Sequence, residues 1–207
     1  MPAAVGSRGH QDKALGCPRL GRSGVLLIAL LLCWAPPFPQ LCLGASPRVE
    51  QEQLKAVYLY NFLQFVTWPT DSKRPDPGPT MTIGIVGNSP MTKALDELAN
   101  SLANVHKTTF QVVHFGKHER GMDLRACNVL FVNASEKYNS AEIIASLQHA
   151  PILTVGDTDD FLSAGGMITM LEQQDRIRYH VNRKAAAAAG LRLSSQLLKT
   201  ALSVQDE

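Results

Sequence analysis

Three aspartates have the type and spacing that could support chemistry. Asp157, Asp159 and Asp160 follow the apolar run 152–155. Carboxylates this close together could hold a divalent cation or act as general acid and base. The sequence shows no histidine or lysine partnered with them, and short carboxylates in turns commonly accept backbone hydrogen bonds instead. We therefore interpret them as turn and cap residues at a candidate ligand or partner surface, and keep a hydrolase that uses them as a remote alternative.

The other reactive side chains form weaker patterns. His114 and His118 have the four-residue spacing of a helical metal clamp, but a glycine between them disfavours a helix and no third ligand is evident. Cys127 precedes an apolar strand and is interpreted as a small buried hydrophobe. The glycines near 84–88 have neither the G-x-G-x-x-G spacing of dinucleotide-binding sites nor the spacing of the P-loop. We expect no catalytic residue, no cofactor and no metal, and hence no enzyme.

An aromatic-rich helix is predicted from Leu54 to the Trp68-Pro69 pair, because proline cannot donate its amide. Its apolar stripe is predicted to face the core. Tyr60 lies off that stripe, and tyrosine is suited to interfaces, so we predict that it contacts a partner. The residues assigned to the stripe are Leu54, Val57, Tyr58, Phe62, Phe65 and Val66.

The N-terminal region is typical of a secretory signal peptide. Arg19 and Arg22 precede an apolar run of 11 residues at 25–35, which is well short of the roughly 20 residues that span a bilayer. A segment ending in small residues follows, and it predicts cleavage between Ala45 and Ser46. Residues 1–45 are therefore expected to be a cleavable leader on an exported chain.

The predicted mature chain, 46–207, has the size of one domain. Removal of the leader leaves 16 basic and 17 acidic residues, so the slight positive charge of the full chain belongs to the leader. A charge near zero gives no long-range field to attract nucleic acid. Cys127 is the one cysteine that remains, so no intramolecular disulfide can form.

Strand and helix patterns alternate along this chain, as in an α/β domain. We predict a single three-layer domain in which helices flank a mixed, largely parallel sheet of about five or six strands. Ligand crevices in such sheets lie beyond the carboxyl ends of strands, which places the stretch 152–168 among the candidates. The predicted strands are 81–86, 108–113, 129–132, 152–155 and 167–171, with an alternating antiparallel strand at 176–181, and the further helices are 91–102, 135–149, one capped by Asn182 and one starting at Ser194-Ser195.

Three stretches in this order resemble the signatures of the YfiR-like periplasmic proteins. The similarity covers about residues 50–203, which is nearly the whole predicted mature chain. The three stretches are Lys55–Phe62 with Phe65, Trp68 and Pro69; Ile152–Asp157 with Phe161 and Gly165–Ile168; and Asn182 with the alanine-rich helix, Gly190-Leu191 and Ser194–Lys199.

The resemblance implies a regulator located in the periplasm. Such proteins bind the periplasmic sensor part of an inner-membrane diguanylate cyclase and hold it inactive, which lowers cyclic di-GMP and biofilm formation. An outer-membrane lipoprotein sequesters the repressor, and a homodimer is a further option. Some members respond to redox conditions through disulfides, which Cys127 alone cannot form within this chain. The alternative function is a periplasmic small-ligand sensor module for another membrane receptor.

Overall fold

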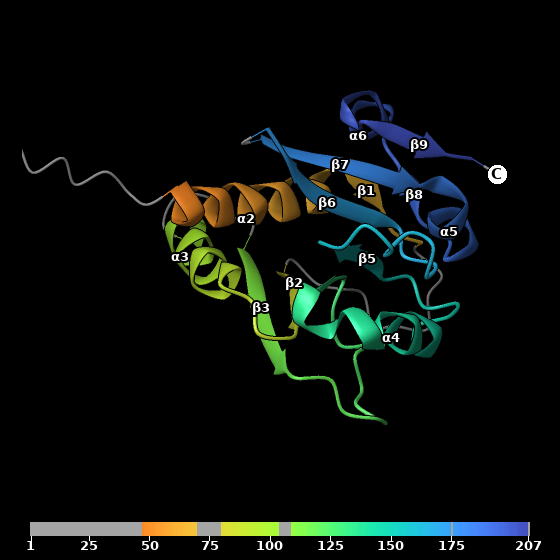
Figure 1. Cartoon of the computed structure of the whole chain (residues 1–207), viewed down its shortest axis with the longest axis horizontal. Coiled ribbons are helices and arrows are strands. Elements are labelled where there is room, and N and C mark those ends of the chain that lie inside the picture. Colours follow the sequence, from red (N-terminus) through yellow and green to blue (C-terminus); the bar gives the residue numbers. More distant parts are fainter. Residues whose placement is uncertain (1–46, 70–79, 104–108, 175, 207) are drawn as a thin grey trace, which may run out of the picture. The chain divides into compact units, whose positions relative to one another are not determined.

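Seven strands form one sheet in the computed structural model, which describes residues 47–69, 80–103, 109–174 and 176–206 (Figure 1). The strand order is β3-β2-β4-β5-β6-β7-β9. The pairs from β3 to β6 are parallel, β6–β7 is antiparallel and β7–β9 is parallel. The strands are β2 (Thr80–Val86), β3 (Thr109–Gly116), β4 (Val129–Val132), β5 (Leu153–Gly156), β6 (Ile168–Gln173), β7 (Arg176–Asn182) and β9 (Ser203–Gln205).

The helices cover both faces of this sheet, so the predicted three-layer α/β domain is confirmed. Along β4, Val129 and Phe131 join the core beneath α2 and α3, whereas Leu130 and Val132 join a second core with α4. Side chains of a strand alternate between the two faces, so a strand buried on both sides is apolar throughout. The helices are α2 (Pro47–Phe65), α3 (Met91–Ala103), the 3-10 helix η2 (Ala134–Asn139), α4 (Ser140–Ser146), α5 (Arg183–Ala188) and α6 (Ser195–Thr200).

The structure adds strands beyond the five or six expected. β9 extends the sheet to seven by pairing with β7. The predicted first helix does not run to Trp68 but ends at Phe65, because Val66–Thr67 (β1) pairs with Arg192–Leu193 (β8) in a separate two-stranded sheet. The predicted helix 135–149 is divided into the 3-10 helix η2, which is itself kinked at Glu136, and α4, which ends at Ser146.

The predicted core stripe is correct for four of its six residues and wrong for Leu54 and Val57. Phe62 and Val66 are buried, and Tyr58 and Phe65 pack, partly buried, against the core. Leu54 and Val57 are exposed, whereas Ala56, Leu59 and Leu63 are buried. The second half of the helix carries apolar residues on nearly every side, so several stripes fit its sequence equally well, and packing against the sheet selects one of them.

Two predictions fall on residues outside those that the structure describes. The leader 1–45, with the cleavage pair Ala45 and Ser46, is one of them. The stretch 70–80, whose three prolines and four charged residues predict a surface loop, is the other, since residues 70–79 are not described.

Candidate functional site

Three parallel strands end side by side at the candidate site. The register aligns Val86 of β2 with Val132 of β4, and Val132 with Gly156 of β5. The residue after each strand therefore lies at the same edge of the sheet, where ligand crevices of α/β domains are found. At β4 and β5 these residues are Asn133 and Asp157.

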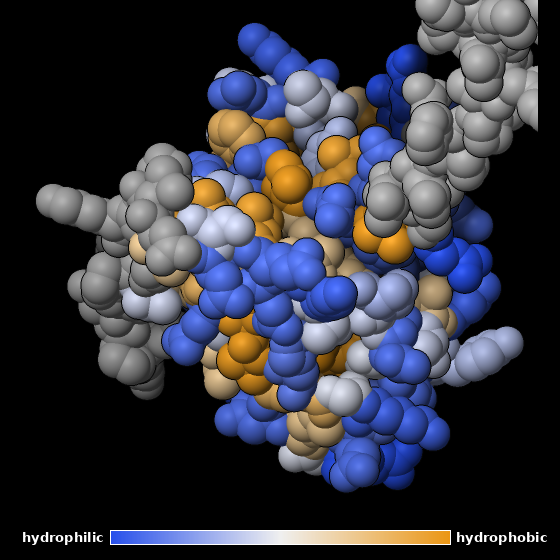
Figure 2. All heavy atoms as spheres, turned by 90° about the vertical axis from the view of Figure 1, so that its left-hand side faces the viewer, coloured by the Kyte–Doolittle hydropathy of each residue, from blue (hydrophilic) through white to orange (hydrophobic). Residues whose placement is uncertain are grey.

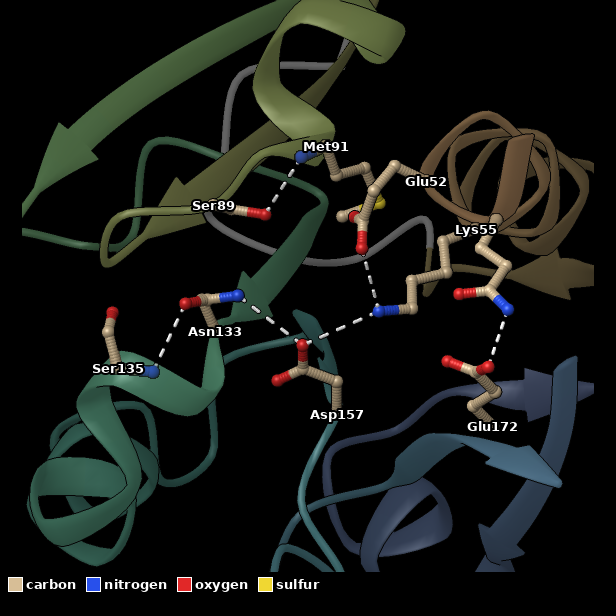
Figure 3. Close-up of polar contacts among 9 residues, drawn as sticks. Glu52, Lys55, Ser89, Met91, Asn133, Ser135, Asp157 and Glu172 are labelled. Carbon is tan, nitrogen blue, oxygen red and sulfur yellow. Dashed lines mark hydrogen bonds and ion pairs between the residues drawn. The ribbon is translucent and has the colours of Figure 1, made fainter. Parts of the chain in front are cut away.

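A polar cluster joins this edge to helix α2 (Figure 3). Lys55 Nζ lies 3.8 Å from Asp157 Oδ2, and Asn133 Nδ2 donates to the same oxygen at 3.3 Å. Lys55 also donates to Glu52 Oε1 at 3.2 Å. The Asp157 and Lys55 side chains are only 10% and 13% exposed. We refer to Glu52, Lys55, Asn133 and Asp157 as the Asp157 cluster.

Burial dominates the electrostatics of Asp157. Desolvation raises the pKa of its carboxyl from 3.8 to about 6, because the charged form loses its hydration. The positive charge of Lys55 and the amide of Ala134 lower the pKa, while the negative charge of Glu52 raises it further. The lysine therefore offsets only part of the cost of burying the carboxylate.

Local hydrogen bonds fix the position of Asn133. Its Oδ1 accepts from the Ser135 amide at 3.1 Å and caps η2, which leaves the Nδ2 group free to reach Asp157. The adjoining turn packs on η2, since the Asn88 amide donates to Ser135 Oγ at 3.0 Å. Gly87 has a φ of +95°, and a Cβ there would lie 2.5 Å from the same Oγ atom. A side chain at position 87 would therefore displace the loop that carries Asn133.

The glycines near Asp157 make room for one aromatic ring. A Cβ on Gly156 would lie 2.5 Å from the Phe161 ring, and a Cβ on Gly166 would lie 2.3 Å from it. Phe161 itself is 1% exposed, and its carbonyl accepts from the Gly166 amide at 2.9 Å. The ring thus fills the turn between β5 and β6, and these glycines are explained by packing.

The model of the YfiR/HmsC-like family matches residues 52–202 of this chain. The chain belongs to the YfiR/HmsC-like family. This family is a regulatory one that acts on diguanylate cyclases in the periplasm. No curated protein matches the chain. None of the helices that the structure describes is long and apolar enough to cross a membrane.

Two solved structures are similar to this YfiR/HmsC-like chain. A conserved domain protein from Vibrio cholerae O1 biovar El Tor has 13% sequence identity and a TM-score of 0.51, which shows a shared fold. The match covers 74% of this chain but only 60% of the Vibrio protein's length. An ABC domain from Streptococcus pneumoniae, solved in complex with L-Trp, has 13% identity and a TM-score of 0.43, with 60% and 55% of the two chains covered.

The three predicted aspartates of this family member do not form a common site. Asp157 turns inward to Lys55, whereas Asp159 and Asp160 are exposed, and Asp160 lies 3.6 Å from Lys137 Nζ. Among the described residues, no group of three or more His, Cys, Asp or Glu side chains could hold a metal ion. The Asp157 cluster instead contains one buried carboxyl, that of Asp157, which can bind or release a proton.

The remaining predicted residues take separate positions in the fold. Tyr60 is partly buried, with its ring 5.5 Å from that of Phe110, and its contact with a partner stays a prediction. His118 is buried 4.0 Å from Glu142, and Cys127 is buried with its Sγ donating to a backbone carbonyl.

Sequence reasoning missed Glu52 and Lys55. They precede the buried residues Ala56 and Leu59 at helical spacing, so they continue the face of α2 that packs on the sheet. This helical spacing is the signal in the sequence that indicates which face of α2 packs on the sheet. A core stripe that includes Leu54 and Val57 instead extends this face to the wrong side of the first turns.

Proposed function

We propose that this chain is an exported repressor that binds the periplasmic sensor part of an inner-membrane diguanylate cyclase. It holds the cyclase in its inactive conformation, which lowers cyclic di-GMP and biofilm formation. Membership of the YfiR/HmsC-like family over residues 52–202 carries this proposal. The leader 1–45 provides the export signal, and an outer-membrane lipoprotein is proposed to sequester the repressor.

The mechanism is a shift in the conformational population of the cyclase. A repressor changes the equilibrium between active and inactive cyclase only by as much as its affinity for the two states differs. A tenfold shift requires about 1.4 kcal/mol of such difference. The binding surface must therefore fit one state of the sensor domain better than the other.

Helix α2 is the surface that we assign to the partner. Its side chains Val49, Leu54 and Val57 are large hydrophobics with 41–50% exposure, and Tyr60 lies on the same helix. Figure 2 shows hydrophobic residues exposed among hydrophilic ones on the side of the domain where α2 begins. Exposed apolar side chains gathered on one helix support a helix-mediated interface with an apolar groove.

Deletion of the gene tests the proposed activity. We expect cyclic di-GMP to rise in the deletion strain and to return to normal when the wild-type chain is supplied. An unchanged level would contradict the repressor function.

Binding measurements test the assigned surface. Leu54→Asp should weaken binding of purified 46–207 to the cyclase sensor domain by at least about tenfold, because charges are poorly tolerated at interface centres. Leu202→Asp is the matched control, since Leu202 is a leucine of similar exposure (51% against 42%) outside α2. Equal affinities of both variants and the wild type would remove α2 from the interface. Tyr60→Ala tests the aromatic contact in the same assay.

A small-ligand sensor for another receptor is a second candidate function. It is supported by a groove of about 360 Å³ between the first turns of α2 and α3, a volume within the range of ligand sites. Glu52 links this groove to the Asp157 cluster, and Arg48, Lys93 and Glu97 line it with both signs of charge. If gene deletion leaves cyclic di-GMP unchanged while a small molecule raises the melting temperature of the domain, this candidate replaces the repressor.

A further inference from the structure

The two edge strands of the large sheet differ in how they are protected. The sheet ends in β3 on one side and in β9 on the other (Figure 1). β9 has only three residues, and Asp206 directly after it pairs with Arg183 at 3.3 Å. β3 has eight residues, none of which is a proline, a lysine, an arginine or an acid. Since short strands, prolines and charges protect sheet edges from pairing with further strands, the edge of β3 is the one open to strand addition.

The backbone hydrogen bonds of β2 show how β3 is oriented. The carbonyls of Thr82 and Val86 accept at 2.8 Å and 3.0 Å from amides at the two ends of β4. Backbone groups of successive strand residues point to opposite sides, so the amide and carbonyl of Ile83 point to β3. Ile83 is in register with Val112, and in a parallel ladder it bonds the two residues that flank this partner.

Three residues of β3 therefore present their backbone outward. The amides and carbonyls of Phe110, Val112 and His114 point away from β2, which makes two groups on each of three residues, or six groups. No residue that the structure describes bonds to these six groups. The irregularity of the β2–β3 ladder comes after His114, so the stretch 110–114 is a regular edge.

We propose that this edge of β3 binds the same edge of a second copy of the chain, in an antiparallel pair centred on Val112. In this register Val112 lies opposite Val112 of the second copy, and Phe110 and His114 lie opposite each other on either side. Opposed residues whose groups point toward one another exchange two hydrogen bonds. The three pairs thus form six bonds, and these bonds use all six outward groups of each strand.

The self-complementarity of β3 is the reason to assign a second copy. Antiparallel pairs centred on Gln111 or Val113 would leave two of the six groups unpaired, at His114 or Phe110, so the pair centred on Val112 is the symmetric one that uses them all. No permanent charge meets a like charge across this axis, because β3 carries none. His114 lies 3.3 Å from Asp96 of its own α3. The interface would join the two seven-stranded sheets into one.

Hydrogen exchange on purified 46–207 tests the pairing without any variant. We expect the amides of Phe110, Val112 and His114 to be protected at high protein concentration and to lose this protection at least about tenfold on dilution. The amides of Gln111 and Val113 are the internal control, because they donate to β2 and should stay protected at both concentrations. Sedimentation equilibrium should show the mass of a dimer at high concentration and that of a monomer after dilution.

Charge reversal at the axis tests the register. Val112→Lys should weaken the dimer about tenfold or more, because two like charges would then lie opposite each other, and Val112→Glu should do the same. An equimolar mixture of these two variants should dimerise again, since each charge then meets its opposite. Val204→Lys is the matched control and should leave the dimer unchanged. Val204 is also a partly buried valine packed on the core, but it lies on β9 at the opposite edge.

Four results would overturn the proposal. The first is a wild-type chain that stays monomeric at every concentration, and the second is a dimer in which the three outward amides exchange freely. The third is a mixture of the folded Val112 variants that dimerises no better than either variant alone. The fourth is protection of these amides only after the cyclase sensor domain is added, which would assign the edge to a partner strand. Hydrogen exchange of the wild type decides the matter if the Val112 variants do not fold, and none of these results depends on the repressor function.

Discussion

Replacement of Asp157 by asparagine should stabilise the domain at neutral pH. The folded state raises the pKa of this carboxyl from 3.8 to about 6, so the folded protein binds a proton more tightly than the unfolded chain does. Stability from this group is therefore fully present below about pH 4 and is lost as the pH rises through about 6. Asparagine resembles the protonated acid in shape and in its lack of charge, and should keep that stability at every pH.

The magnitude follows from the same two pKa values. Each pKa unit corresponds to 1.36 kcal/mol, so the interval from 3.8 to about 6 gives about 3 kcal/mol as the largest gain for Asp157→Asn above pH 6. No large correction for solvent screening applies, because the side chain is only 10% exposed. Lys55 loses one partner in the variant but retains Glu52 at 3.2 Å. We therefore expect a net stabilisation of about 2–3 kcal/mol at pH 7.

Urea unfolding followed by circular dichroism measures this effect. Free energies of unfolding of wild type and Asp157→Asn should coincide near pH 4 and diverge up to about pH 7. A variant that is less stable than the wild type at pH 7 would show that the Lys55 contact outweighs desolvation. A gain of the same size at pH 4 would show that the effect is unrelated to ionisation. Asp160→Asn should leave the pH dependence of the wild type in place.

Two further predictions concern the packing of the turn after β5 and the start of α6. Gly166→Ala should destabilise the domain by about 3 kcal/mol or more, because its Cβ would lie 2.3 Å from the Phe161 ring and 2.8 Å from the Phe161 carbonyl oxygen. Gly121→Ala is the comparison, because a Cβ there would have no atom within 4 Å and only the φ of +86° would be strained. We expect this variant to lose about 1–2 kcal/mol of stability. Ser194→Ala removes the side chain that accepts from the Leu197 amide at 3.2 Å and should cost about 0.5–2 kcal/mol. Urea unfolding at pH 7 measures all three, and a Gly166→Ala variant as stable as Gly121→Ala would contradict the packing argument.

Much of the sheet is predictable from the sequence because its signals are local. The strands β2, β4 and β5 are short apolar runs, as expected for strands buried on both faces. The alternation in β7 correctly indicates an antiparallel strand with one exposed face. Asn182 caps its helix through the Ala185 amide, as its position before the alanine run predicts.

The features that were missed depend on distant partners. β1 and β8 have two residues each, and their pairing joins Val66 to Leu193 across most of the domain sequence. β9 is Ser-Val-Gln, which carries no strand pattern of its own and forms by adding to β7. The Lys55–Asp157 contact likewise requires α2 to be placed over the end of β5, and spacing along the chain cannot show this.

The two parts of the Gly156-Asp157 pair therefore have different explanations. Packing accounts for Gly156, because any side chain there would meet the Phe161 ring. Stability does not account for a carboxylate at 157: burial of its charge outweighs the attraction of Lys55, and an asparagine could accept the same hydrogen bond from Asn133. Buried ionisable groups with shifted pKa values are concentrated at functional sites, where stability is given up for activity. Asp160, which also pairs with a lysine but in solvent, has no comparable cost. The burial of Asp157, which Asp160 lacks, is therefore the physical reason to expect that the function of Asp157 depends on binding and releasing a proton.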